Sequence, residues 1–312
     1  MKKIVLFAAN GFIGKALIDY TVKNHPDYQI TAISRTLMKN LPASVKQVQW
    51  DGKTKGNWTI ELEHADLVIN LAGKSVNCRY TRKNKAAIFA SRLDSTRIIG
   101  EAIEDCINKP KCWMNMASAT IYEHSLENPN TEKNGIIGKG FSVNVCKAWE
   151  KQFFAFKDLP VRQIVLRTTI VLGESGGVYP VLKRLTRFGL GGKMGKGNQQ
   201  ISWIHIEDFC SAVFFLFENN QAIGIYNVGS PNPVRNKLFQ FELRKSLNIH
   251  CFINHPKIFL RLGALIIGTE NELVLKSRFI HPEQLNKLGF QFQFPSIDLC
   301  LNDLKNKNKQ KI

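Results

Sequence analysis

The sequence has no unbroken run of about 18 apolar residues, the length that a transmembrane helix needs. The segment that comes closest, residues 258–267, is short and contains Arg261. A second apolar stretch, residues 4–7, follows two lysines in the manner of a secretory signal, but it is too short for one. We therefore expect no membrane span.

The cysteines also lack a pattern. Seven of them are scattered along the chain, and no two form a Cys-x-x-Cys pair. The histidines and acidic residues show no metal-ligand spacing either. These absences argue against a disulfide framework and a metal site, and they predict a protein of the reducing cytoplasm.

Acidic residues are few compared with basic ones: 25 Asp and Glu stand against 43 Lys and Arg, a formal net charge of +18. Such an excess suits nucleic acid, an anionic membrane surface or anionic small ligands. The basic residues are mostly dispersed, however, and no nucleic-acid-binding motif accompanies them. We therefore expect a solvated basic surface and no specific nucleic-acid partner.

The most informative stretch lies at the start, where the apolar residues 4–7 are followed by Asn10-Gly11-Phe12-Ile13-Gly14. The pattern predicts a strand buried on both faces and a tight glycine turn that opens a helix. Gly11 lets the backbone approach a pyrophosphate, and Gly14 lets the helix pack closely on the strand. This is a dinucleotide-binding fingerprint, incomplete because Ala8 stands where the first glycine of G-x-x-G-x-x-G belongs.

The second expected strand lacks the acidic residue that holds the ribose 2′-hydroxyl of NAD in such folds. No Asp or Glu lies between Asp27 and Asp51, and the strand ends in Ser34 and Arg35. A guanidinium at this place suits a 2′-phosphate through charge-assisted hydrogen bonds. The sequence therefore favours NADP(H) over NAD, the alternative being that Arg35 is an ordinary exposed side chain.

The rest of the chain alternates between apolar runs and helical periodicity. Strands are predicted at residues 28–34, 45–50, 66–70, 111–116, 161–167 and 225–228, and helices at 81–108, 142–157 and 208–218. Strands alternating with helices predict an α/β fold with a Rossmann-type, doubly wound parallel sheet.

Changes in composition along the chain also predict how it divides into domains. We expect a nucleotide-binding Rossmann domain at residues 1–230, with the glycine-rich stretch 172–200 contributing to the cleft. A small C-terminal substrate lobe is expected at 231–304, and a disordered basic tail at 305–312.

Several stretches together resemble a known family, the extended short-chain dehydrogenase/reductases of the atypical "epimerase family protein" branch. The stretches are Asn10-Gly11-Phe12-Ile13-Gly14, Asn70-Leu71-Ala72-Gly73, Ser91-Arg92-Leu93-Asp94-Ser95-Thr96, Leu166-Arg167-Thr168-Thr169-Ile170-Val171-Leu172-Gly173, Ser202-Trp203-Ile204-His205-Ile206-Glu207-Asp208 and Gly289-Phe290-Gln291-Phe292. Their order and spacing match from about residue 3 to residue 304, which covers nearly the whole chain.

The resemblance implies a cofactor site for NADP(H). Its residues would be Gly11, Phe12, Ile13, Gly14, Ser34, Arg35, Leu71, Ala72 and Gly73, with Arg92 and Val171 also lining the cofactor. It further implies a C-terminal lobe that closes a substrate cleft. A homodimer through the helices near 81–108 and 142–157 is a common arrangement in the wider superfamily.

Catalysis is less well marked. Active short-chain dehydrogenases use Ser or Thr at the end of the fifth strand and a Tyr-x-x-x-Lys pair on the next helix. Ser118 stands where the serine belongs, but the helix lacks the pair. Tyr122 follows Ser118 by four residues and is our candidate proton donor, whereas the spacing of Tyr179 and Lys183 is interpreted as coincidence.

Three further residues are candidates for binding the substrate. Trp203 and His205 flank the expected cleft, and Arg167 at a strand end suits an anion. A hydrogen-bonded structural role remains the alternative for His205, and Arg167 can equally anchor the cleft loops.

Two functions remain open. The first is an NADP(H)-dependent oxidoreductase or epimerase that acts on a small polar or anionic substrate, for example one of the nucleotide-sugar kind. The second is a non-catalytic NADP(H)-binding sensor or scaffold, which the missing Tyr-x-x-x-Lys pair favours.

Overall fold

The computed structural model describes residues 1–255 and 276–307. The apolar segment 258–267 and the last part of the predicted tail, residues 308–312, lie outside the described residues.

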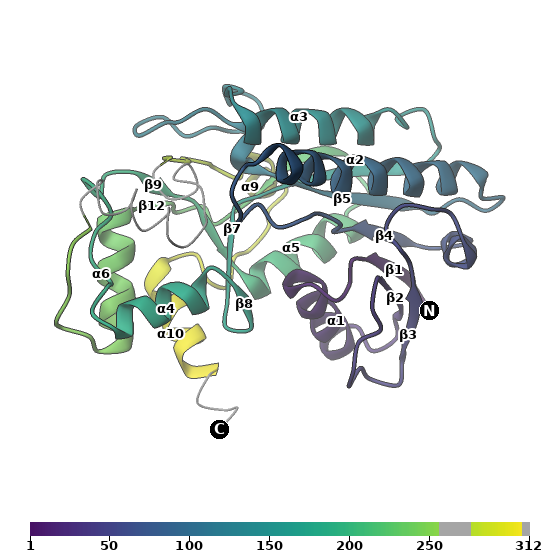
Figure 1. Cartoon of the computed structure of the whole chain (residues 1–312). Coiled ribbons are helices and arrows are strands. Elements are labelled where there is room, and N and C mark those ends of the chain that lie inside the picture. Colours follow the sequence, from purple (N-terminus) through teal and green to yellow (C-terminus); the bar gives the residue numbers. More distant parts are fainter. Residues whose placement is uncertain (256–275, 308–312) are drawn as a thin grey trace.

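A seven-stranded parallel sheet forms the centre of the molecule (Figure 1). Its strands are β1 (Lys3–Phe7), β2 (Gln29–Ser34), β3 (Val45–Gln49), β4 (Leu67–Asn70), β5 (Cys112–Ser118), β6 (Arg162–Thr168) and β11 (Gly224–Val228). They lie in the order β11-β6-β5-β4-β1-β2-β3. The predicted strands and the Rossmann-type topology are confirmed, and the order reverses between β1 and β4, where such sheets bind ligands.

Helices cover both faces of this sheet. On one face lie α1 (Phe12–Asn24) and α5 (Ile206–Glu218); on the other, α2 (Arg82–Asp105) and α3 (Phe141–Phe154) lie side by side (Figure 1). The alternation along β1 explains the two cores, since Ile4 and Leu6 face the first pair of helices and Val5 and Phe7 face the second. All four side chains are at most 2% exposed, as the apolar run at residues 4–7 predicts.

A smaller lobe adjoins the carboxyl edge of the sheet (Figure 1). Its helices are α4 (Tyr179–Arg187), α6 (Asn236–Leu247) and α10 (Ile297–Lys307), whereas the short helix α9 (Glu283–Lys287) packs against β11 of the main sheet. Its short strands are β7 (Ile170–Gly173), β8 (Gly176–Gly177), β9 (Gln200–Ile201), β10 (Trp203–His205) and β12 (Val234–Arg235). One apolar core joins α4, α6, α10 and β10, so the lobe takes in residues that precede the predicted boundary at 231.

The predicted disordered tail begins too early. Residues up to Lys307 belong to α10, and the Lys307 ammonium pairs with Glu207 and, at 3.0 Å, with Asp303. The pair with Glu207 of α5, together with the buried Leu304, holds the helix end onto the domain, while the pair with Asp303 lies within α10.

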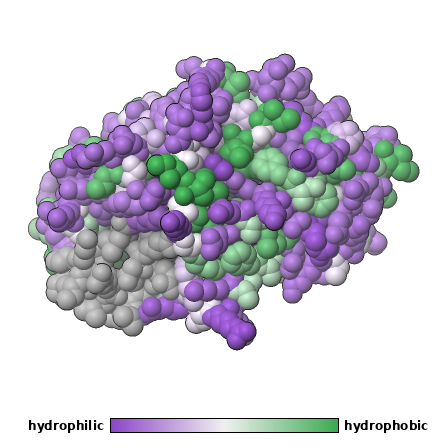
Figure 2. All heavy atoms as spheres, turned by 90° about the horizontal axis from the view of Figure 1, so that it is seen from above, coloured by the Kyte–Doolittle hydropathy of each residue, from purple (hydrophilic) through white to green (hydrophobic). Residues whose placement is uncertain are grey.

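The visible surface is mainly hydrophilic. Seen from above, hydrophilic residues cover most of the visible face, with hydrophobic groups between them (Figure 2). Within residues 1–255 and 276–307, no helix is both long and apolar enough to cross a membrane.

Candidate functional site

The glycine turn is intact despite its missing first glycine. Ala8 takes the left-handed conformation with φ of +58°, which a glycine would adopt without strain. A Cβ added at Gly14 would lie 2.4 Å from the carbonyl oxygen of Ala9, so only glycine lets α1 pack here. A Cβ added at Gly11 would contact only the carbonyl oxygen of Ala8, at 3.5 Å.

Gly11 is therefore not required by the packing of the chain itself. It is the N-cap of α1 and makes no side-chain cap, and the first turn contains no acidic residue. The helix thus begins with backbone N–H groups that no capping side chain satisfies, which suits a phosphate. This turn fits the pyrophosphate of a dinucleotide.

The end of β2 lies beside this turn, because Phe7 of β1 pairs with Ile33. The buried Ser34 donates a hydrogen bond from its hydroxyl to the carbonyl oxygen of Thr36 at 2.7 Å, so it shapes the turn. Arg35 is exposed next to it. The Asn10 amide bonds the Thr36 hydroxyl at 3.0 Å and ties the glycine turn to the end of β2.

The end of β4 brings the predicted segment Leu71, Ala72 and Gly73 to the same edge. A Cβ at Gly73 would lie 3.2 Å from the Cζ of Arg92, so the guanidinium rests against this backbone. Arg92 donates to the carbonyl oxygens of Lys74 and Ile88, both at 3.1 Å, and its guanidinium lies over the Trp149 ring. Burial lowers the pKa of Arg92 from its ordinary value.

The β7–β8 hairpin covers the glycine turn from the lobe side. Cβ atoms added at Gly173, Gly176 or Gly177 would come within 2.6–3.1 Å of the Phe12 ring. Val171, 8% exposed, lies on the first strand of this hairpin. The structure thus brings the predicted Phe12 and Val171 together.

A cleft of about 250 Å³ opens between the sheet edge and the lobe. Ser118 lines it at the end of β5, with Thr168 on the neighbouring β6. The Ser118 hydroxyl donates to the Thr120 hydroxyl at 3.0 Å and accepts from the Thr120 amide at 3.2 Å. Ser118 is the one predicted catalytic residue that reaches this cleft.

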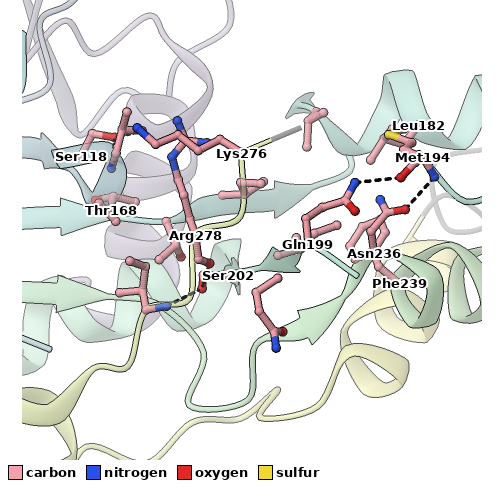
Figure 3. Close-up of a pocket in the computed structure, with 18 of the residues that line it drawn as sticks. Ser118, Thr168, Leu182, Met194, Gln199, Ser202, Asn236, Phe239, Lys276 and Arg278 are labelled. Atoms are coloured by element: carbon pink, nitrogen blue, oxygen red, sulfur yellow. Dashed lines mark hydrogen bonds between the residues drawn. The ribbon is translucent and has the colours of Figure 1, made fainter. Parts of the chain in front are cut away.

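Two charged residues of the cleft, Lys276 and Arg278, were not among the predicted site residues. Lys276 and Arg278 extend from the lobe towards the strand ends that carry Ser118 and Thr168 (Figure 3). Among the described residues that line the cleft, these two are the only charged ones. A Lys-Ser-Arg segment has no distinctive local pattern, so only its placement in the fold marks it.

Tyr122 does not reach the cleft, contrary to its predicted role as proton donor. Its side chain is fully buried, and its hydroxyl donates to Asn227 at 2.9 Å and accepts from Arg167 at 2.8 Å. Burial raises the pKa of Tyr122, although Arg167 opposes this. The ring is held between elements and cannot swing over a cofactor without breaking these bonds.

Arg167 is likewise buried rather than available to a substrate. It donates to both carboxylate oxygens of Glu150, at 2.8 and 2.7 Å, in a bidentate pair. Burial alone would lower the pKa of Arg167, but the hydrogen bonds and charge of Glu150 raise it above its ordinary value. In place of the predicted anion, Arg167 binds the carboxylate of Glu150 on α3 in an internal ion pair.

Trp203 and His205 are fully buried as well, and neither lines the cleft. The His205 Nδ1 accepts from the Glu207 amide at 3.1 Å and caps α5, and its Nε2 lies 3.1 Å from Asp303. Burial lowers the pKa of His205 to about 3, with a further contribution from Lys307, so the ring is neutral near pH 7. The structural alternative for His205 is the one that this geometry supports.

Tyr179 and Lys183 lie on helix α4, not in a loop as predicted, with Pro180 in its first turn. Both are buried, and Lys183 pairs with Glu174 at 2.6 Å. Leu182 of this helix and its N-cap residue Val178 line the cleft instead. In the described part of the chain, no group of three His, Cys, Asp or Glu side chains could hold a metal ion.

Comparison with known families covers almost the whole chain. Residues 4–229 match the NAD dependent epimerase/dehydratase family, and residues 255–304 match a domain of unknown function, DUF1731. An "epimerase family protein" of Staphylococcus aureus is 30% identical over 308 residues, which span 98% of this chain and 100% of that protein. Its counterpart in Staphylococcus saprophyticus is 29% identical over 304 residues, 97% of this chain and 99% of that one.

Solved structures agree with the fold. Human epimerase family protein SDR39U1, crystallised with NADPH, superposes with a TM-score of 0.84 at 26% identity, over 97% of this chain and 99% of that one. UDP-glucuronic acid 4-epimerase of Bacillus cereus, in complex with UDP-glucuronic acid and NAD, gives a TM-score of 0.77 at 16% identity, over 99% and 100% of the two chains. The second likeness is one of fold alone.

Proposed function

This chain belongs to the NAD dependent epimerase/dehydratase family, and on that premise we propose that it binds NADP(H) and transfers hydride to or from a small polar substrate. The glycine turn carries the proposal. A side chain at Gly11 would meet almost no other atom of the chain, so packing does not explain the glycine. Beside it lie the first N–H groups of α1, which no side chain caps.

The residues proposed to hold the cofactor form one continuous edge. Gly11–Gly14 would take the pyrophosphate, and Leu71–Gly73 with Arg92 would line the next strand end. Arg35 would pair with the 2′-phosphate, since no carboxylate follows β2 to bind a 2′-hydroxyl. The NADPH bound by the human relative supports the same preference.

Ser118 is the residue proposed to act on the substrate. Bound NADPH would supply a hydride to a carbonyl carbon of the substrate. The Ser118 hydroxyl, at the end of β5, would turn its hydrogen from the Thr120 hydroxyl to the carbonyl oxygen of the substrate, and that oxygen would take the proton that completes the alcohol from water in the cleft. Thr120 would then keep Ser118 oriented, because its amide donates to the same hydroxyl.

A non-catalytic NADP(H)-binding protein is the second candidate. The observation that favours it is the lining of the cleft, where the described residues include no Tyr, His, Asp or Glu. A sensor needs the cofactor edge but no proton donor.

The test is a paired fluorescence titration with NADPH and NADH on wild type and Arg35→Ala. We expect wild type to prefer NADPH and the variant to lose about tenfold in NADPH affinity, since a charge-assisted hydrogen bond contributes about 1.5–3 kcal/mol. Lys39→Ala, an exposed cation four residues further on, is the control and should change little. Absence of binding to either nucleotide would refute the proposal.

NADPH consumption in the presence of carbonyl compounds then separates the two candidates. Turnover that Ser118→Ala abolishes, with NADPH affinity retained, supports the enzyme. NADPH binding without turnover across a broad carbonyl panel supports the sensor.

A further inference from the structure

A polar network runs behind the cofactor edge, from the segment after β4 into the helices and back to the same segment. It begins at Ala72, whose backbone amide donates to the side-chain oxygen of Asn70 at 3.0 Å. The side-chain amide of Asn70 donates in turn to the Thr96 hydroxyl on α2 at 3.2 Å and to Asn115 on β5 at 2.7 Å. These three side chains are at most 1% exposed, so the end of β4 is tied to α2 and β5 by groups that water does not reach.

Thr96 is the junction of the polar network. A threonine hydroxyl can donate one hydrogen bond and accept two. That of Thr96 donates to the side-chain oxygen of Asn115 at 3.3 Å and accepts from Asn70. It also accepts from the indole N–H of Trp149 on α3, at 3.0 Å. The hydroxyl is therefore fully used, and the orientation of the Trp149 ring is fixed by a hydrogen bond as well as by packing.

The face of the Trp149 ring contacts Arg92, whose Cζ lies 5.0 Å from the ring centroid. The cation–π attraction that holds a guanidinium in such a place is strongest for tryptophan. Nη1 of Arg92 donates to the Lys74 carbonyl at 3.1 Å. A Cβ added at Gly73 would lie 3.2–3.5 Å from Cζ, Nη2 and Nε of Arg92, so this edge of the guanidinium rests on the backbone after β4. The polar network thus closes on the segment where it begins.

The same turn of α2 holds this segment at a second atom. The Lys74 amide donates to the Ser91 hydroxyl at 2.9 Å, while its carbonyl accepts from Arg92. Because the N–H and the C=O of one residue are both bound by α2, the backbone after β4 and the Arg92 guanidinium fix each other's position. A site held in this way need not be ordered by its ligand on binding.

We propose that Thr96 and Trp149 are positioning residues of the cofactor site, which hold the Arg92 guanidinium against residues 71–74 in the geometry that binds NADP(H). Neither side chain contacts the cofactor; each acts through Arg92. This proposal rests on the proposed function, since it concerns the same cofactor edge, and it adds the residues that preorganise that edge.

The experiment is a double-mutant cycle on NADPH affinity, measured by fluorescence titration of the full chain. Arg92→Met should weaken binding about tenfold, because it removes a charged hydrogen-bond donor. Thr96→Val keeps the shape of the side chain without its hydroxyl. It should weaken binding about fivefold in the wild-type background but less than about twofold in the Arg92→Met background, since residues that act through one another are not additive. Thr96→Ser keeps the hydroxyl and should stay within about twofold of wild type.

Two further variants serve as replacement and control. Trp149→Phe keeps a ring beneath the guanidinium but removes the indole N–H, and it should reproduce the pattern of Thr96→Val, including in a chain where the valine prevents folding. Thr31→Val removes another buried threonine hydroxyl, one on β2 that bonds Glu61 at 3.3 Å. It should leave NADPH affinity unchanged in both backgrounds.

Either of two results would overturn the proposal. One is an equal loss of affinity with and without Arg92, which a general loss of stability predicts. The other is unchanged affinity in both Thr96→Val and Trp149→Phe. Both leave the cofactor site standing, because they are measured against NADPH binding by the wild type. A wild type that binds neither NADPH nor NADH refutes the proposed function, and this proposal with it.

Discussion

The cofactor edge and the substrate wall of the cleft are built in different ways. The pyrophosphate turn of the cofactor edge, Gly11–Gly14, rests on consecutive residues of one strand–turn–helix unit and offers backbone N–H groups, and the neighbouring ends of β2 and β4 add Arg35 and Leu71–Gly73 to it. The substrate wall is assembled from residues 118–120, 199–202 and 276–280, which hydrogen bonds and packing bring together across the chain. A site made of backbone atoms accepts few residue types at its own positions. A wall assembled from distant segments depends instead on the buried polar contacts that hold those segments together.

The largest expected effect comes from the buried polar network of Arg167, Glu150 and Tyr122 behind the substrate wall. Arg167→Met leaves the Glu150 carboxylate buried without its bidentate partner, and we expect a loss of about 3–5 kcal/mol in the free energy of unfolding. Urea denaturation measures it. The control is Lys111→Met, which breaks a pair with Asp66 whose lysine is 79% exposed, and should cost less than about 1 kcal/mol. Equal losses in the two variants would contradict the structural role of Arg167.

The two fingerprint glycines separate folding from binding on the cofactor edge. Gly14→Ala forces a Cβ to 2.4 Å from the Ala9 carbonyl oxygen, an overpacking that we expect to cost about 1–3 kcal/mol beyond any gain in helix propensity. Gly11→Ala meets only a 3.5 Å contact, so its cost should stay within about 1 kcal/mol while NADPH affinity falls. Thermal unfolding and nucleotide titration of both variants would show the split. A larger loss of stability in Gly11→Ala than in Gly14→Ala would mean that Gly11, not Gly14, is the glycine that the packing of α1 requires.

Tyr122→Phe sharpens the difference between a catalytic and a structural tyrosine. The change removes the hydroxyl that joins Arg167 and Asn227, and we expect it to cost about 1–3 kcal/mol of stability. NADPH affinity should be unchanged, because the side chain lies outside the cleft. Tyr20→Phe, on a partly buried ring that stacks on Phe214, serves as control. A variant with full stability but no turnover would restore the predicted proton-donor role.

His205 gives an effect that appears only as a pH dependence of stability. Its pKa is lowered to about 3 in the folded state from an ordinary value of 6.5, so between those values the unfolded chain binds a proton that the folded chain excludes. Stability is therefore lost as the pH falls, by about 2 kcal/mol between pH 6.5 and pH 5.

The His205→Asn variant should lack this loss while keeping an N-cap for α5. The neighbouring Asp208, whose pKa burial raises to about 6, contributes the opposite slope in an overlapping range, but it does so in both proteins. The difference between the two stability curves thus isolates His205. Parallel curves from pH 7 to pH 5 would show that the imidazole is not excluded from protonation.

The sequence by itself determined the sheet, the helices that cover it and the glycine turn. The predicted boundaries of the main strands and of the three long helices lie within three residues of those observed, because apolar periodicity and glycine spacing are local properties of the chain. The placement of Ser118 at the cleft also followed, since the end of a parallel strand must lie at the carboxyl edge.

Only the tertiary structure decided which polar side chains face the substrate. Tyr122, Arg167 and His205 carry suitable chemistry, yet each is turned inward by contacts distant in sequence: hydrogen bonds to Asn227 and Glu150 for the first two, and packing against Phe294 for His205. Lys276 and Arg278 carry no motif, but strand-like pairing with residues 200–202 sets them in the cleft. Burial and pairing of a side chain depend on contacts between distant segments, and no local pattern records them.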